Sequence, residues 1–229
     1  MSSPPTHDDR PAERWHLVLD ARSSRERGRR TLARLLDAAA AEFSAYGYHG
    51  TRVARIAKRA HTSHGSFYVY FEGKNDLVLA MQEEIVAEGD HLLESIPELQ
   101  PDAAGFLALR AWLARVCESF LEHAAVRSAI LDAIIDDADP RISKVGLRAQ
   151  HRWTTALADR IRAAGADDID PYLAALCIDN LIDRATRSIH RGQLLVSLDE
   201  LVDGVTELVH RSVFGSAQPS RSHPAPTTP

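Results

Sequence analysis

The chain has 229 residues but only two cysteines, Cys117 and Cys177. They lie 60 positions apart, and neither has a nearby cysteine or histidine at the spacing that metal sites use. We therefore expect two buried, unpaired thiols, and neither a bound metal ion nor another cofactor.

Long hydrophobic runs are also missing. The longest uncharged apolar stretches, such as residues 38–41, are far shorter than the roughly 20 residues needed to cross a bilayer. Residues 1–14 are polar and include Asp8, Asp9 and Glu13, which is unlike the basic and then apolar start of a secretory signal. These absences predict a cytoplasmic protein without a membrane span.

The alternating pattern of β-strands is absent too, whereas apolar residues recur at helical spacing. Leu32, Leu36 and Phe43 belong to a predicted first helix of about 17 residues that ends at Gly47. Two short helices should follow, with Thr51 and Ser63 as their N-caps. Three short helices in so few residues predict a small bundle.

The remaining helices are longer. A connecting helix should run over residues 75–96, followed by helices at 102–123, 125–136, 141–164, 171–191 and 198–214. Ser197 and Glu200 have the spacing of a capping box at the start of the last one. The fold class is therefore all-α, with about nine helices.

This pattern divides the chain into four parts. We expect a flexible basic arm over residues 1–28, with a short helical turn around residues 15–19, and a three-helix domain over residues 29–73. A larger helical domain should cover residues 74–214, and residues 215–229 should form a disordered tail.

The chain also lacks an overall positive charge, because its formal net charge is −5. The charge is unevenly distributed, however. Residues 10–59 contain twelve Lys or Arg and five acidic residues, whereas residues 74–229 contain fifteen basic and twenty-four acidic residues. A basic N-terminal domain on an acidic body could meet DNA phosphates at one end only, although a solvated charged surface would also fit.

The segment over residues 39–77 reads AAAEFSAYGYHGTRVARIAKRAHTSHGSFYVYFEGKNDL and has the features of a helix-turn-helix. Val53, Ile56 and Ala57 can pack the first short helix against its neighbours. Small and polar residues open the second helix, where a major-groove reader needs close approach and hydrogen-bonding groups. These residues are Ser63, His64, Gly65 and Ser66.

From Phe43 to Leu77 the sequence resembles the DNA-binding signature of the TetR family of repressors. The matching positions are Phe43, Gly47, Tyr48, Thr51, Val53, Ile56, Ala57, Ala60, Ser63, Gly65, Phe67, Tyr68, Tyr70, Phe71, Lys74 and Leu77. The turn departs from the signature, because His61 and Thr62 replace the usual Gly and Val. Histidine tolerates a positive φ better than most residues, so a left-handed turn is still expected.

The resemblance implies a homodimeric transcriptional repressor, not an enzyme, that binds palindromic operator DNA. Five residues would contact phosphates, namely Thr51, Arg52, Tyr68, Tyr70 and Lys74. His64, Ser66 and Thr62 would face base edges, with Ser63 and Gly65 shaping the approach of the helix. The arginines at positions 22, 25, 27, 29 and 30 could reach DNA from the arm. The alternative is that they only keep the arm soluble.

For the C-terminal domain the resemblance implies a small-molecule effector and a dimer interface. A mostly apolar pocket with few polar groups suits a hydrophobic effector, and the candidate lining residues are Phe106, Trp112, Phe120, Trp153 and Asn180. The last two helices would form the dimer through Leu173, Leu176, Leu181, Leu201, Val205, Leu208 and Val209. Packing within one chain is the alternative for each of these residues.

Two other functions compete with this interpretation. A helical enzyme would need an acid, base or metal constellation, and the sequence shows none, since the closest histidine pair is His61 and His64 in the predicted turn. A DNA-organising protein would bind DNA without an effector and with little sequence preference.

Overall fold

A computed structural model describes residues 15–23, 25–166 and 169–215 of the chain. Over these residues the protein consists of helices α2 to α11 and contains no strand. This confirms the predicted all-α fold. The predicted tail over residues 216–229 and the first part of the arm lie outside the described residues.

The N-terminal domain contains α2 (His16–Arg22), α3 (Glu26–Gly50), α4 (Val53–Arg59) and α5 (His64–Tyr68). Helix α3 is longer than predicted because it already begins at Glu26. Its helical geometry is interrupted at Gly47, as predicted, where φ is +65° and glycine avoids the strain that a side chain would cause.

The flexible arm predicted over residues 1–28 is wrong for its last part. Residues 16–22 form α2, and Trp15 and Leu19 are completely buried. The Trp15 indole donates a hydrogen bond to Asp37 on α3. The sequence indicated only a short helical turn around residues 15–19, because the seven residues of α2 are too few to show a sustained pattern.

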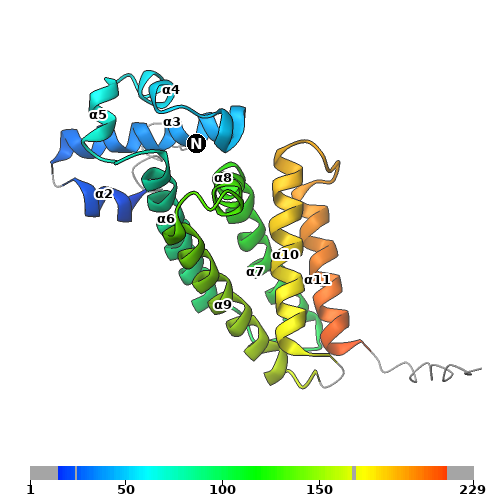
Figure 1. The fold of residues 1–229 in the computed structure, drawn as a ribbon. Coiled ribbons are helices and arrows are strands. Elements are labelled where there is room, and N and C mark those ends of the chain that lie inside the picture. The colour runs from blue at the N-terminus through cyan, green and yellow to red at the C-terminus, as the bar shows by residue number, and fades with distance from the viewer. Residues whose placement is uncertain (1–14, 24, 167–168, 216–229) are drawn as a thin grey trace, which may run out of the picture.

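The C-terminal domain contains α6 (Lys74–Glu94), α7 (Ala103–Glu122), α8 (Ala124–Ile135), α9 (Pro140–Ala163), α10 (Pro171–His190) and α11 (Leu198–Phe214). The predicted limits of the last five helices hold to within one or two residues. Side-chain caps fix several of these helix starts, and the capping box at Ser197 and Glu200 is present. In Figure 1, α10 and α11 stand side by side on the flank remote from α2.

Two hydrophobic cores hold the protein together. The first joins the N-terminal domain to α6 and α8, and the second joins α7, α9, α10 and α11. The first core includes Phe67 of α5 together with Ile130 of α8. The N-terminal domain is therefore packed onto the C-terminal body through shared apolar contacts, and any shift of α6 or α8 acts on it directly.

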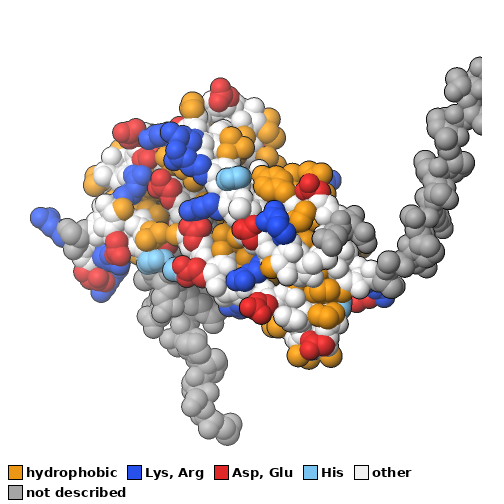
Figure 2. All heavy atoms as spheres, turned by 90° about the horizontal axis from the view of Figure 1, so that it is seen from below, with side chains coloured by type: hydrophobic (Ala, Val, Ile, Leu, Met, Phe, Trp, Pro, Cys, Tyr) orange, Lys and Arg blue, Asp and Glu red, His pale blue; other side chains and the backbone are white. Residues whose placement is uncertain are grey.

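The surface away from the N-terminal helices is mixed. Figure 2, which looks at the molecule from below, shows basic and acidic side chains interspersed with apolar ones, without a continuous basic surface. No helix among the described residues is both long enough and apolar enough to pass through a bilayer.

Candidate nucleic-acid interface and effector pocket

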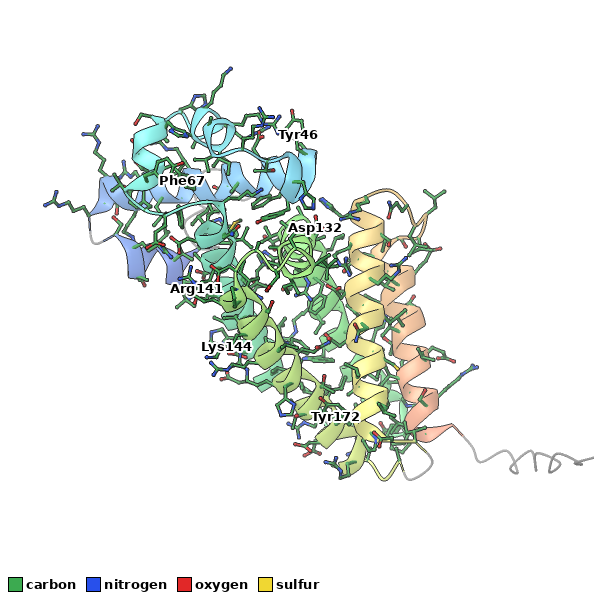
Figure 3. All side chains as sticks on the ribbon, in the orientation of Figure 1. Tyr46, Phe67, Asp132, Arg141, Lys144 and Tyr172 are labelled. Carbon is green, nitrogen blue, oxygen red and sulfur yellow. The ribbon has the colours of Figure 1, made fainter. Side chains whose placement is uncertain are left out.

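Helices α4 and α5 form the paired helices that the sequence predicted. Ile56 of α4 and Phe67 of α5 are fully buried, and Figure 3 shows Phe67 inside the N-terminal domain. The turn between the helices passes through His61, whose φ is +52°, as expected for a left-handed residue. The amide of Thr62 donates to the carbonyl of Ala57 and closes the turn at 3.0 Å.

The first turn of α5 faces outward. Ser63 caps the helix, and its hydroxyl accepts from the amide of Ser66 at 3.1 Å. His64 and Gly65 are exposed beside it, and Ser66 is half-buried. Because the buried Phe67 anchors the opposite side, this polar end is held in a fixed direction toward solvent.

Thr51 does not cap α4, contrary to the prediction. The N-cap is Arg52, and the Thr51 hydroxyl instead donates to the carbonyl of Gly47 at 2.7 Å. Only 3% of Thr51 is exposed. The broken helix end at Gly47 leaves a carbonyl to satisfy, and the threonine satisfies it.

Lys74 braces the N-terminal domain from the start of α6. Its ammonium group donates to the Tyr48 carbonyl at 2.7 Å and lies 3.7 Å from the centre of the Tyr48 ring. Burial lowers the pKa of Lys74, while Asp136 opposes this effect. The Tyr48 hydroxyl in turn donates to Asn75 at 2.5 Å, and Asn75 donates to the Ala138 carbonyl.

The other predicted phosphate ligands differ in access. Arg52 is exposed and so is Tyr68, with an exposed fraction of 51%. Tyr70 is half-buried, and its carbonyl accepts a 2.6 Å hydrogen bond from Arg22. Arg22 is thus bound within the protein and is not part of a free arm.

A groove runs between the start of α3 and the recognition helix α5. The basic side chains along it are Arg22, Arg25, Arg27, Arg29, Arg30 and Arg34. The same groove is lined by His61, Thr62 and Ser66 of the helix-turn-helix. The arginines expected on a flexible arm are therefore presented mainly by the rigid first turns of α3.

Glu42 organises the basic side of α4. This glutamate of α3 is 3% exposed and lies 2.8 Å from Nε of Arg59 and 3.0 Å from Nε of Arg55. Only the contact with Arg59 has the direction of a hydrogen bond. Arg52 and Lys58 have no such partner among the described residues, so their charges stay available at the surface.

A pocket of about 400 Å³ lies in the C-terminal domain between α6, α7, α8, α9 and α10. Its apolar side chains are Ile85, Val86, Leu92, Phe120, Ile130, Leu131, Ile134, Leu147, Ala149 and Trp153. Gly89 on α6 has no side chain, which lets the Trp153 indole lie against that helix, with a Cβ position only 3.1 Å from its nitrogen.

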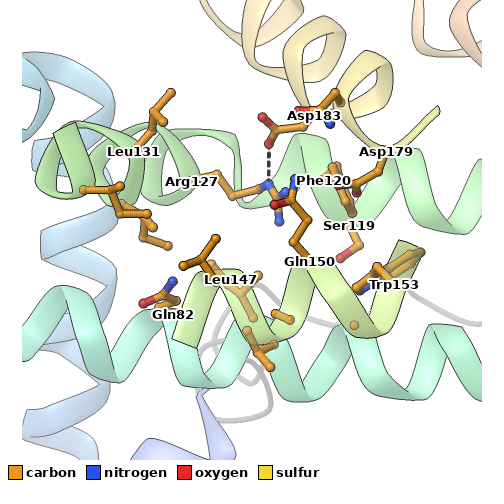
Figure 4. A pocket seen from close by; sticks show the side chains of 18 of the residues that line it. Gln82, Ser119, Phe120, Arg127, Leu131, Leu147, Gln150, Trp153, Asp179 and Asp183 are labelled. Atoms are coloured by element: carbon orange, nitrogen blue, oxygen red, sulfur yellow. Dashed lines mark hydrogen bonds and ion pairs between the residues drawn. The ribbon is translucent and has the colours of Figure 1, made fainter. Parts of the chain in front are cut away.

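One wall of this pocket is charged. Arg127 of α8 donates from Nε to Asp183 of α10 at 2.8 Å, and its guanidinium lies 3.8 Å from the centre of the Phe120 ring. Arg187 donates to the same carboxylate at 2.6 Å. Figure 4 shows the Arg127–Asp183 contact on this wall of the pocket, with Asp179 nearby on α10.

The chain's relationship to known proteins agrees with this geometry. Residues 35–81 match the family model described as "Bacterial regulatory proteins, tetR family". The chain therefore contains a DNA-binding region of the TetR type. The matched residues include α4, α5 and the first part of α6.

Two curated relatives from Bacillus subtilis (strain 168) match part of the sequence. The uncharacterized HTH-type transcriptional regulator YdgC is 35% identical over 72 residues, which cover 31% of this chain and 37% of YdgC. The fatty acid metabolism regulator protein is 36% identical over 50 residues, which cover 22% of this chain and 26% of that protein. The matched regions therefore span well under half of either relative.

Solved structures extend the likeness to the whole fold. A TetR-like transcriptional regulator from Rhodococcus sp. RHA1 has a TM-score of 0.64 at 21% identity and covers 81% of this chain and 97% of its own. The transcriptional regulator FadR from Bacillus subtilis, solved in complex with stearoyl-CoA, has a TM-score of 0.57 at 22% identity, covering 81% and 99%. The family and the fold are those of transcriptional regulators.

Three of the five predicted effector-site residues line the pocket, namely Phe120, Trp153 and Asn180. Phe106 and Trp112 do not, which corrects the prediction. Phe106 packs against His210 of α11, and Trp112 is buried in the second core with its indole donating to the Leu92 carbonyl. Aromatic size alone cannot distinguish a core side chain from a pocket wall.

The predicted thiols also differ from each other. Cys117 is buried, and burial raises its pKa to about 12, whereas Cys177 is exposed on α10. Among the described residues, no cluster of three or more His, Cys, Asp or Glu could hold a metal ion.

The sequence prediction missed the charged pocket residues Arg127, Asp179 and Asp183. A usable signal was present, because Arg127 interrupts the apolar helix that follows residue 123, and Asp179 and Asp183 are four residues apart on α10. Charged residues at positions that should be buried often mark a functional site.

Proposed function

We propose that this TetR-family regulator is a repressor that binds palindromic operator DNA as a homodimer and leaves it when a small hydrophobic effector occupies the pocket. The observation that carries the proposal is the exposed polar end of α5, anchored from behind by Phe67 and set beside a groove lined with arginines. Sequence-specific binding to a duplex needs both base contacts from the helix and phosphate contacts from the flanking residues.

The roles within this interface follow from exposure. His64 at the start of α5 is exposed and would contact base edges, whereas Arg52 and Tyr68 would contact phosphates. Lys74 would add its charge to the phosphate side while it braces Tyr48. Thr51, whose hydroxyl hydrogen is already bound by Gly47, would contribute chiefly by fixing the start of α4.

The homodimer would form through α10 and α11. Leu173, Leu181 and Leu208 are between 41% and 58% exposed on these two helices, which supports a covering partner. Val205 and Val209 are only 2% exposed and pack within the chain, so they belong to the second core and not to this surface.

Helix α6 would connect the effector to the DNA. Its middle, including Ile85 and Gly89, lines the pocket, and its first turn holds the N-terminal domain through Lys74 and Asn75. Ile130 of α8 lines the pocket and also belongs to the first core. An effector that shifts these helices would change the spacing of the two recognition helices and favour a dimer that no longer fits its operator.

The apolar lining supports a hydrophobic effector. Two of the compared proteins point the same way, since one is a fatty acid metabolism regulator and another was solved with stearoyl-CoA. We include in the proposal a ligand with a substantial apolar part, because ten apolar side chains line the pocket.

The test begins with selection of bound fragments from the host genome, followed by affinity measurements on the selected duplex and a scrambled one. We expect wild-type protein to prefer the selected duplex by at least about a thousandfold at moderate salt. His64→Ala should cost about 1 to 3 kcal/mol on the operator and relax the preference at particular base pairs. Arg52→Ala should weaken binding to all duplexes and reduce the salt dependence by about one phosphate contact.

Arg148→Ala is the matched control, because Arg148 is exposed on α9, away from the N-terminal domain. It should bind both duplexes like the wild type. Equal affinity for selected and scrambled DNA would contradict the proposal and favour a DNA-organising role, and unchanged binding by both test variants would refute the residue assignments.

A further inference from the structure

Three hydrogen-bond donors in the pocket lining are used within the protein. The amide of Asn180 donates to the Leu176 carbonyl at 2.8 Å, and the hydroxyl of Ser119 donates to Glu88 at 2.7 Å. Gln82, which is 4% exposed, donates from Nε2 to the Ile142 carbonyl at 3.1 Å.

Two acceptors in the pocket lining have no donor. Oε1 of Gln82 accepts no hydrogen bond among the described residues. The carboxylate of Asp179 likewise has neither a hydrogen bond nor an ion pair within the described part of the chain, although it lines the pocket. Both acceptors are therefore available to a hydrogen-bond donor on a ligand.

This arrangement shifts the pKa of Asp179. Burial raises its pKa to about 6, and Asp183 adds to the rise, while Arg127 opposes it. The neighbouring Asp183 behaves differently, because Arg127 and Arg187 hold its pKa below the usual value in spite of burial. One carboxylate is thus neutralised by arginines, whereas the other is desolvated without a direct partner.

Arg127 is the only Lys or Arg among the side chains that line the pocket, and it already has contacts within the protein. Its Nε is bound to Asp183, and its guanidinium stacks on Phe120. The lining thus contains one arginine and two aspartates, a charge of −1 when all three are ionised. A ligand anion at Arg127 would lie close to both carboxylates and be repelled by them. A ligand cation would balance the excess negative charge of the lining.

We infer that the effector carries a cationic hydrogen-bond donor, such as a protonated amine, which pairs with Asp179 while its apolar part packs against Phe120 and Trp153. This inference rests on the proposed function of the pocket as the effector site. The apolar part has room to extend toward Leu131 and Leu147, which line the pocket and are 38% and 66% exposed at its rim. A volume of about 400 Å³ suits a medium-sized amine.

The test uses three probes with the same ten-carbon chain, n-decylamine, n-decanol and decanoate, each kept below its micelle concentration. Calorimetry on full-length protein at neutral pH should show the amine binding at least about tenfold more tightly than the alcohol, and decanoate no more tightly than the alcohol. Asp179→Asn should bring the amine within about threefold of the alcohol. Asp199→Asn, a change at an 89% exposed carboxylate on α11, should keep the full preference.

Folding is checked by thermal unfolding of each variant. Asp179→Asn removes a desolvated charge, so it should unfold at the same or a higher temperature than wild type at neutral pH. Tightest binding of decanoate, an unchanged amine preference in Asp179→Asn, or no binding of any probe would each overturn the inference. A preference for the amine that depends on Asp179, without release of the operator, would uphold it and refute the proposed release mechanism instead.

Discussion

At the scale of single residues, half-buried ion pairs position the N-terminal domain. Asp76 at the start of α6 accepts hydrogen bonds from both terminal nitrogens of Arg22, at 2.9 and 3.0 Å, and from the amide of Glu72 at 3.0 Å. Because Arg22 also donates to the Tyr70 carbonyl, this pair ties α2, the end of the recognition helix and α6 at one point. Burial raises the pKa of Asp76, but Arg22 and Glu72 outweigh it and lower the pKa below 3.8.

Asp76 should therefore make stability depend on pH in the acid range. Its contribution is fully present above the unfolded-state pKa of about 3.8 and is lost as the pH falls through the lower folded-state value. At neutral pH, Asp76→Asn should lower the free energy of unfolding by about 1 to 3 kcal/mol, with a smaller difference from wild type in strong acid. Urea unfolding at several pH values measures both effects.

Asp20→Asn provides the control for this prediction, since Asp20 is 64% exposed and pairs with Arg29 at the surface. It should change stability by no more than about 0.5 kcal/mol. A difference between wild type and Asp76→Asn that stays constant from neutral to strongly acid pH would show that the carboxylate charge is not what stabilises the contact.

At the scale of elements, α2 exists because it is docked. Seven residues are too few for a stable isolated helix, so its structure depends on contacts with α3 and α6. Glu84 of α6 accepts from the amides of Leu17 and Val18, at 3.2 and 2.9 Å, and thereby caps the start of the helix. Leu19 then inserts its side chain into the first core.

Two leucines on α2 make a matched pair for testing this docking. Leu19 is 1% exposed and Leu17 is 41% exposed. Leu19→Ala should reduce the free energy of unfolding by about 2 to 4 kcal/mol, because it removes buried methyl groups and leaves a cavity. Leu17→Ala should cost less than about 1 kcal/mol.

Denaturant unfolding gives the two values, and amide hydrogen exchange in α2 shows whether the helix itself loosens. Similar small costs for both variants would mean that α2 does not dock in solution. Such a result would also leave the ion pair between Arg22 and Asp76 without its structural basis.

At the scale of the whole molecule, the two hydrophobic cores support different parts of the protein. The first holds the DNA-binding helices on α6 and α8, and the second supports α10 and α11, whose outer sides remain apolar. The pocket lies where residues of both cores meet, since Ile130 belongs to the first and Phe120 to the second. An effector at this place touches the helices that set the DNA-binding domain and those proposed to set the dimer.

If the dimer forms through α10 and α11, a charged residue introduced on the exposed side of α10 should dissociate it. Wild-type protein should have twice the chain mass of 25.3 kDa in light scattering after size exclusion. Leu181→Arg should shift the protein to monomer at micromolar concentration and weaken operator binding at least about tenfold, because one half-site contact is lost on dissociation. Leu107→Arg, at a 63% exposed leucine of α7, should remain dimeric.

A dimeric Leu181→Arg protein with normal operator affinity would place the interface elsewhere. A wild-type protein that stays monomeric at micromolar concentration and still binds its operator would exclude the dimer from the proposal altogether.

Local patterns in the sequence were sufficient for helices α3 to α11 and for the paired-helix motif. The apolar period, Gly47, the cap at Ser63 and the capping box at Ser197 act within a few residues, so they can be read without knowing the fold. The direction of the recognition helix followed as well, since Phe67 had to face inward for the polar residues before it to face outward.

Tertiary structure alone decided which side chains meet across the fold. The helix at α2 depends on Glu84, 66 positions away from Val18, and the pocket wall joins Arg127 to Asp183, 56 positions apart. The same reason explains why Phe120 lines the pocket while Trp112 is core, and why Thr51 bonds to Gly47 instead of capping α4. Burial and charge pairing depend on neighbours brought together by folding, and no local pattern carries that information.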